Sequence, residues 1–219
     1  MLIQAPHSWN VTPEEGIEIQ SQLRHQVIRQ DRLDLLSSVA GIDVGFEADG
    51  TITRAAVVVL SYPGLTVQEK SLARRATTFP YVPGLLSFRE VPAVLDALTN
   101  LTALPDLLLC DGQGIAHPRR FGIASHLGLI LNIPSIGVAK SRLIGQHLPI
   151  GDIRGDSQPL MDGEEMIGVV LRTRSNVKPV YVSTGHRVSV ETAVEIALCC
   201  TLNYRLPEPI RQAHHLASD

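Results

Sequence analysis

The sequence predicts an α/β fold in which three antiparallel strands and then parallel strands form one mixed sheet flanked by helices. The 44% hydrophobic content with only 4% aromatic residues is typical of a core packed from Val, Leu, Ile and Ala. Apolar runs joined by short turns come first, and apolar runs alternating with helical patterns follow. A chain of 219 residues can bury one large core, so we expect a single domain over 1–219.

The first expected element is a helix over about 12–29, ahead of a core over about 36–205. Thr12, Pro13 and Glu15 are arranged as an N-cap, a first-turn proline and a capping-box acid. Apolar residues then recur at imperfect helical spacing. They are Ile17, Ile19, Leu23, Val27 and Ile28.

Three strands joined by short turns should follow. The apolar segments 38–45 and 55–60 are separated by a Gly-containing turn, and Tyr62-Pro63-Gly64 leads into a third strand over 67–76. Short turns of this kind connect antiparallel neighbours, so the segment predicts a meander. Residues 77–84 contain two prolines and are expected to form a fixed loop rather than a strand or helix.

The second half should alternate helices and strands. A helix from the region of Glu90 to about residue 101 has Val91, Val94, Leu95 and Leu98 at helical spacing. The other expected elements are a strand at 107–110, a helix at 122–131, a strand at 134–138, hairpin additions within 145–174, a strand at 180–182 and a helix at 189–202. The remaining 207–215 segment is expected to lie over the surface as a tail.

Two aspartates are candidate functional residues because each lies in or directly after an apolar strand. Asp111 directly follows Leu107-Leu-Leu-Cys110, and Asp43 is the one charge in the run 38–45. Ligands collect at the carboxyl ends of such strands, and buried charges are paired or bind metals. A shared cation is therefore indicated. The alternative for Asp111-Gly112 is a simple turn, and Glu90, a third candidate, has the alternative of a first-turn acid favoured by the helix dipole.

Charge and cysteine content restrict the class of protein. The net charge of −3 argues against a non-specific nucleic-acid coat, although short basic clusters such as Arg119-Arg120 allow a local basic groove. The three cysteines have neither disulfide-framework nor zinc spacing and indicate a reducing compartment. No leader pattern or long apolar run is present, so we expect a cytoplasmic, monomeric protein with no membrane contact.

The order of the expected elements is that of the ribonuclease H-like fold, and five motifs give a closer resemblance. They are Gly41-Ile-Asp-Val-Gly-Phe46, the segment from Thr77 to Glu90, Asp111-Gly-Gln-Gly-Ile-Ala-His-Pro-Arg-Arg120, Ile136-Gly-Val-Ala-Lys140 and Thr184-Gly-His-Arg-Val-Ser-Val190. Together they resemble endonuclease V, a family of nucleases that repair deaminated bases. The resemblance covers about residues 26–211, and Gln113 stands where the family commonly has histidine.

The resemblance implies a Mg²⁺-dependent endonuclease, with Mn²⁺ as a substitute, that acts in DNA repair. Such an enzyme recognises inosine and hydrolyses the second phosphodiester bond on its 3′ side, which leaves 3′-hydroxyl and 5′-phosphate ends. By resemblance, Asp43, Glu90 and Asp111 are the metal ligands, and Lys140 completes the catalytic set. For an isolated lysine, the alternative is an ordinary surface position after a strand.

The resemblance also implies nucleic-acid contacts. The Pro80-Tyr81-Val82-Pro83 loop resembles the family's wedge, in which Tyr81 fills the space left by a flipped base. A tyrosine packed inward on a proline-fixed turn is the alternative. The full expected set is Tyr81, Pro80, Pro83, Gly84, Arg89, Gly112, His117, Arg119, Arg120, His126, Gly137 and, as a weaker candidate on the tail, His214.

Two other functions stay open at this point. Cleavage of inosine-containing RNA is the first alternative, because contacts to a 2′-hydroxyl cannot be read from sequence. A non-catalytic binder of flipped bases is the second, although the complete set of three acids favours a nuclease.

Overall fold

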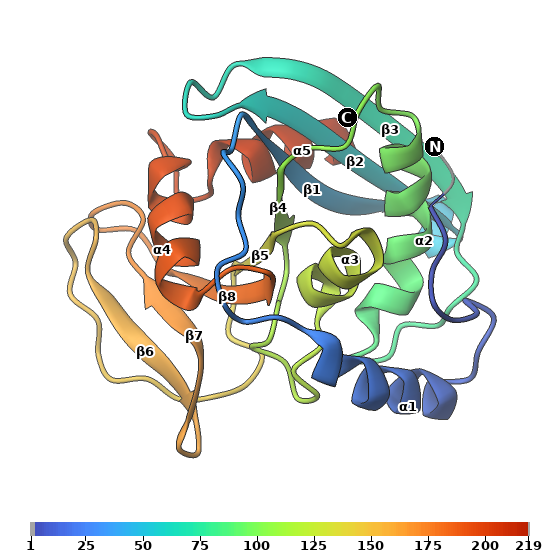
Figure 1. Cartoon of the computed structure of the whole chain (residues 1–219), viewed down its shortest axis with the longest axis horizontal. Helices are drawn as coiled ribbons and strands as arrows, with labels where there is room; N and C mark the ends of the chain where they lie inside the picture. Colours follow the sequence, from blue (N-terminus) through green and yellow to red (C-terminus); the bar gives the residue numbers. More distant parts are fainter. Residues whose placement is uncertain (1–2, 219) are drawn as a thin grey trace.

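The computed structural model describes residues 3–218 and confirms the mixed α/β fold (Figure 1). One sheet of eight strands has the order β3-β2-β1-β4-β5-β8-β7-β6, in which β1, β4 and β5 are mutually parallel and the other neighbours are antiparallel. The strands are β1 Ser38–Glu47, β2 Ile52–Ser61, β3 Val67–Ala76, β4 Leu107–Asp111, β5 Ser135–Ala139, β6 Ser157–Asp162, β7 Glu165–Leu171 and β8 Val180–His186. The meander β1-β2-β3 followed by parallel β4 and β5 is the ribonuclease H-like arrangement expected from the sequence.

Helices cover both faces of this sheet (Figure 1). Residues of α2 and α3 pack on one face, and residues of α4 and α5 pack on the other. The helices are α1 Pro13–Leu23, α2 Leu86–Thr99, α3 Ile123–Leu131, α4 Val190–Cys199 and α5 Glu208–Ser218. Among the residues described, no helix is long and apolar enough to span a bilayer.

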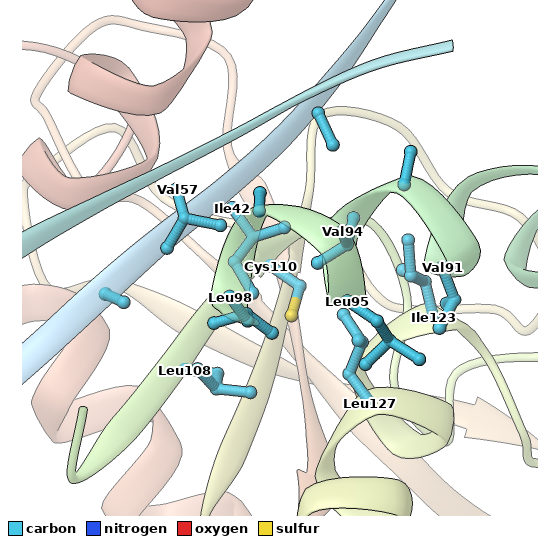
Figure 2. Packing of buried hydrophobic residues seen from close by; sticks show 14 of the residues in the cluster. Ile42, Val57, Val91, Val94, Leu95, Leu98, Leu108, Cys110, Ile123 and Leu127 are labelled. Atoms are coloured by element: carbon cyan, nitrogen blue, oxygen red, sulfur yellow. The ribbon is translucent and has the colours of Figure 1, made fainter. Parts of the chain in front are cut away.

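The central strand β4 is apolar throughout because both of its faces are covered. Leu108 and Cys110 join the cluster beneath α2 and α3, whereas Leu107 and Leu109 face the α4 side. Figure 2 shows the first cluster, in which Val91, Val94, Leu95 and Leu98 of α2 project toward the sheet. This burial holds β4 rigidly, and the polar residue at its end is fixed in place.

The register of the sheet brings the two predicted aspartates together. β1 and β4 are parallel, and Ile42 is paired with Cys110. The next residue along each strand is Asp43 on β1 and Asp111 on β4. Side chains at matching positions of neighbouring parallel strands lie on the same face, so the two carboxylates are adjacent by construction.

The N-terminal helix is shorter than expected. The capping box is confirmed, since the Glu15 amide donates to Thr12 Oγ1 and the Thr12 amide donates to the Glu15 carboxylate. The prediction that the helix reaches residue 29 is wrong, because α1 ends at Leu23 and one 3₁₀ turn continues to Gln26. Ile28 is instead hydrogen-bonded to the end of β8, which requires an extended backbone.

The expected surface tail is also wrong. Residues 208–218 form α5, which packs against β1 and β2 with Ile210, Ala213 and Ala217 buried. The backbone of Pro209 lies so close to β1 that a Cβ built on Gly41 would be 1.9 Å from the Pro209 carbonyl oxygen. Glycine at position 41 is therefore what allows α5 to sit on the strand that carries Asp43.

Candidate active site

Three side chains from three elements converge at the carboxyl end of the central strand β4. Asp43 extends from β1, Asp111 ends β4, and His214 lies on α5. One ligand atom from each of the three lies within 4.8 Å of the others, and His214 Nδ1 is 2.6 Å from Asp43 Oδ2. Two carboxylates and an imidazole so close together form a donor set that suits a divalent cation.

Lys140 supplies the positive charge of this group. It directly follows β5, the parallel neighbour of β4, and its Nζ lies 2.5 Å from Asp111 Oδ2. Burial and the charge of Asp43 raise the pKa of Asp111, and the ion pair with Lys140 offsets part of that shift. The structure therefore brings Asp43, Asp111 and Lys140 together as the sequence predicted.

Glu90 lies beside this group without joining it. Its carboxyl is on the buried face of α2 and is not one of the described atoms within the 4.8 Å set. Burial, followed by the charges of Asp43 and Asp111, raises its pKa to about 8, which is partly opposed by Arg89. Without a cation, Glu90 is therefore mostly protonated at neutral pH.

A cleft of about 400 Å³ opens onto these residues. Its walls come from the loop before α2, from the segment after β4 and from the turn after β5, and Asp111 and Lys140 both line it. Tyr81 stands at this cleft with 72% of its surface exposed, and Pro80 and Pro83 are exposed beside it. The loop is thus outside the core, as predicted, and the inward-packed tyrosine is excluded.

The wedge-like loop is held by its Gly84 carbonyl. That oxygen accepts hydrogen bonds from Gln20 Nε2 at 3.1 Å, His117 Nε2 at 2.9 Å and Arg119 Nη2 at 2.7 Å. Gly84 has φ +79, a conformation that favours glycine. Three donors on one carbonyl make the cleft wall rigid, and Arg119 acts here as part of that support.

His117 is a neutral structural donor. Its Nε2 must carry the proton to donate to Gly84, while its Nδ1 accepts from the Arg119 amide at 3.2 Å. Burial and the nearby charge of Arg119 lower its pKa to about 4, which agrees with a neutral ring. It lines the cleft but is only 4% exposed.

The prediction that His126 contacts nucleic acid is wrong, because its side chain is 0% exposed. It is enclosed by aromatic rings, its Nδ1 bonds Ser87 Oγ, and its Nε2 lies 2.7 Å from His7 Nε2. Burial, together with His7, holds the pKa of His126 well below its usual range. It is a core residue behind the cleft.

Two other expected contact residues, Arg89 and Arg120, are occupied within the protein. Arg89 donates to the carbonyls of Phe79 and Gly50, and the guanidinium of Arg120 pairs with Asp162 and Glu165. Arg120 is also mostly buried, with 14% of its side chain exposed. The guanidinium groups of Arg89 and Arg120 therefore link segments of the protein to one another.

Gly137 has a different role from the one expected. A Cβ on Gly137 would be 2.3 Å from the Gly114 amide nitrogen, so the glycine lets β5 approach the segment after β4 instead of a ligand. Gly112, with φ +148, does lie in the cleft wall.

Sequence reasoning placed one residue of this site on the wrong kind of element and missed another. His214 was expected to contact nucleic acid from a surface tail, although Ile210, Ala213 and Ala217 have the helical spacing that could have revealed α5. Gln20 was not considered, and it is 1% exposed with hydrogen bonds to Gly84, Phe121 and Arg119. Its helical spacing from Gly16 and Leu23, the other buried positions of α1, is the signal that could have found it.

Comparison with known proteins agrees with this geometry. The family model described as Endonuclease V matches residues 21–215. The endonuclease V of Trichormus variabilis is 62% identical over 220 residues, which is 100% of both chains. The crystal structure of endonuclease V from Streptomyces avermitilis has a TM-score of 0.91 at 43% identity and covers 100% of this chain and 96% of that one.

A solved complex adds a ligand. The structure of Ciona intestinalis endonuclease V with a 24mer DNA containing an inosine followed by a ribo-adenosine has a TM-score of 0.82 at 31% identity. The match covers 94% of this chain and 95% of that chain. The likeness therefore extends over the sheet, the cleft and α5, and the chain belongs to the endonuclease V family of nucleases.

Proposed function

We propose that this nuclease recognises inosine in DNA and hydrolyses the second phosphodiester bond on the 3′ side, leaving a 3′-hydroxyl and a 5′-phosphate. The observation that carries the proposal is the cleft of about 400 Å³ that opens directly onto Asp111 and Lys140, with exposed Tyr81 beside it. A cleft of this size accommodates one base, and enzymes that read a single base take it out of the stack. The inosine-containing DNA bound to the Ciona intestinalis relative supports this ligand.

The residues present fit a divalent cation. Asp43, Asp111 and His214 would hold it, with Mg²⁺ or Mn²⁺ as the ions that carboxylate oxygens favour. Burial, followed by the charges of neighbouring carboxylates, raises the pKa of Asp111 and of Glu90, so a cation here would favour their ionised forms. A bound ion supplies Lewis acidity that stabilises charge on the oxygens of the scissile phosphate.

Lys140 and Glu90 supply the other charged groups of the proposed reaction. The ammonium of Lys140, held at Asp111, stabilises negative charge that develops on the phosphate. Glu90, protonated while the site lacks a cation, becomes a further carboxylate when positive charge offsets Asp43 and Asp111. Lys140 acts from the turn directly after β5 and Glu90 acts from a buried face of α2, so little reorganisation is needed.

Base recognition is assigned to the cleft. Tyr81, supported by Pro80 and Pro83, fills the gap left in the stack, and the proline-limited loop loses little entropy on insertion. The backbones of Gly84 and Gly112, both in the wall, approach the flipped base closely.

Cleavage of RNA is the second candidate. The strand bound to the Ciona intestinalis relative has a ribo-adenosine after its inosine, so that relative accommodates a 2′-hydroxyl at this position. The same position in this chain would be read by the residues around Asp111.

The test uses 5′-labelled DNA, RNA and DNA with one ribonucleotide after the lesion, each with and without a single inosine. Each strand is incubated with Mg²⁺, Mn²⁺ or EDTA. We expect a single product, cut at the second phosphodiester bond on the 3′ side of inosine. This product should form only when a cation is present. Equal cleavage of strands without inosine would overturn the proposal, and binding without any product would identify a non-catalytic binder.

A further inference from the structure

The turn after β5 carries Lys140, an exposed residue. β5 ends at Ala139, and the residues from Ala139 to Leu143 line the cleft. The Lys140 side chain is 40% exposed, yet its Nζ is held 2.5 Å from Asp111. A long flexible side chain reaches one place reproducibly only when the backbone beneath it is fixed.

Two side chains fix this backbone by their hydrogen bonds to consecutive carbonyls. Arg205 Nη2 donates to the Lys140 carbonyl at 2.5 Å and to the Pro179 carbonyl, just before β8, at 2.6 Å. Gln113 Nε2 donates to the Ser141 carbonyl at 3.1 Å from the segment after β4. The turn is thus hydrogen-bonded, through Arg205, to the residue before β8 and, through Gln113, to the segment after β4.

Arg205 is itself anchored for this role. Thr173 Oγ1 donates to the Arg205 carbonyl at 2.6 Å, and the neighbouring Tyr204 ring stacks under Arg211 of α5. Among the described side chains, no acid forms an ion pair with Arg205, and its Nε is buried without a partner. The contacts of the Arg205 guanidinium are therefore its hydrogen bonds to the carbonyls of Lys140 and Pro179.

We propose that Arg205 is a positioning residue for strand cleavage, which acts through the Lys140 backbone to place the Lys140 ammonium, with Gln113 as the second support of the same turn. This inference rests on the proposed role of Lys140. Misplacement of a reacting group by about 1 Å can cost on the order of 100-fold in rate. The effect should therefore fall on the chemical step and should depend on Lys140 being present.

The experiment is a double-mutant cycle measured by single-turnover cleavage at saturating protein and cation. Arg205→Gln should lower the rate constant by about 10- to 100-fold, and Arg205→Lys should restore part of it. In a Lys140→Met background, the same Arg205→Gln change should cost less than about threefold, because coupled residues are not additive. Gln113→Leu should also lower the single-turnover rate constant, but by a smaller factor than Arg205→Gln.

The chain offers a matched control. Arg154 Nη2 also donates to two carbonyls, those of Leu198 at 2.8 Å and Thr201 at 2.9 Å, away from the cleft. Arg154→Gln removes the same kind of contact and should leave the cleavage rate unchanged. An equal loss of rate in both arginine variants, or full additivity of Arg205→Gln with Lys140→Met, would overturn the proposal.

Hydrogen exchange decides the point independently of the substrate. Peptides that contain residues 139–143 should exchange at least about tenfold faster in Arg205→Gln than in the parent, while the β4 peptide stays protected. Unchanged protection of the turn would also overturn the proposal. If the parent protein cleaves no inosine-containing strand, the proposed function fails, but the exchange result still decides whether Arg205 holds the turn.

Discussion

At the residue scale, the two strand aspartates dominate the expected chemistry. Asp43→Asn and Asp111→Asn should each reduce cleavage below detection, because each removes a proposed cation ligand. Neither change should strongly destabilise the cation-free protein, because burial and the charge of Asp43 raise the pKa of Asp111, and each change removes one of these two neighbouring carboxylates. Single-turnover cleavage and thermal unfolding in EDTA measure the two effects, and near-normal turnover in either variant would contradict the ligand assignment.

A pH dependence follows from His186, which is 2% exposed and accepts the Ile28 amide on Nδ1. Burial, then the charges of Arg187 and Arg32, lower its pKa to about 4 from 6.5. Since the folded pKa is depressed, the stabilisation from neutral His186 is present above pH 6.5 and is lost as the pH falls toward about 4.

His186→Gln should therefore make stability less dependent on pH between these values. Urea midpoints at pH 4.5 and 7.5 should differ less in the variant than in the parent, with exposed His25→Gln as the control. An identical pH dependence in parent and His186→Gln would mean that other groups control acid unfolding.

At the scale of elements, the loop before α2 should determine selectivity. Tyr81→Ala removes the exposed ring and should weaken binding of inosine-containing strands by about 10- to 100-fold, because stacking of one base is worth about 1–3 kcal/mol. The rate of the bound complex should change little. Binding and single-turnover cleavage of matched strands separate these effects, and unchanged affinity and selectivity would exclude a wedge.

The contact between α5 and β1 gives a second prediction at this scale. Gly41→Ala places a Cβ against the Pro209 backbone, which must shift α5 and with it His214. We expect a loss of about 1–3 kcal/mol in stability together with slower cleavage. Gly64→Ala, whose Cβ would be 3.2 Å from the Ser61 hydroxyl, is the control, and a Gly41→Ala protein with normal activity would show that α5 is not needed in this position.

The elements differ in how far the sequence could predict them. The strand 67–76 and the helix 123–131 were predicted almost to the residue, because apolar period and turn residues agree there. The end of α1 was missed because Ile28 is held by a distant partner at β8, which no local pattern records. α5 was missed because Pro207 and Pro209 suggested a tail, although Pro207 precedes the helix and Pro209 lies in its first turn, where proline is tolerated.

At the scale of the whole molecule, part of the positive charge is neutralised internally. Arg29, Arg74, Arg75, Arg172 and Arg211 each form ion pairs with nearby acids. Because the net charge is −3, we expect only a few phosphate contacts, so binding should weaken with salt along a slope of only about −2 to −4.

Arg142 is the cation best placed to contribute to that slope, because it is exposed, lines the cleft and has no ion pair among the described residues. Arg142→Ala should reduce the salt slope by about one and weaken all strands alike. Titrations of binding against salt for strands with and without inosine make the measurement. If the salt dependence of binding is the same in Arg142→Ala and the parent, Arg142 does not contact a phosphate.

The site was predictable where it follows from strand order and not where it depends on tertiary contact. Asp43 and Asp111 could be placed together because parallel neighbours share a register. The roles of His126 and His214 were misassigned, because exposure and the docking of a helix depend on packing between segments more than 100 residues apart in the chain. Spacing within a motif carries no information on such contacts.

The docking of α5 also fixes the order in which this enzyme can mature on the ribosome. His214 is synthesised after every strand of the sheet, so a nascent chain can already hold Asp43 and Asp111 in a folded core while the third donor is still in the exit tunnel. During that interval, the surface of β1 and β2 that Ala213 and Ala217 later cover is exposed to solvent. The nascent protein therefore has an apolar, aggregation-prone face and an incomplete site. With the proposed set of cation ligands, catalytic competence is deferred until translation of this helix is complete.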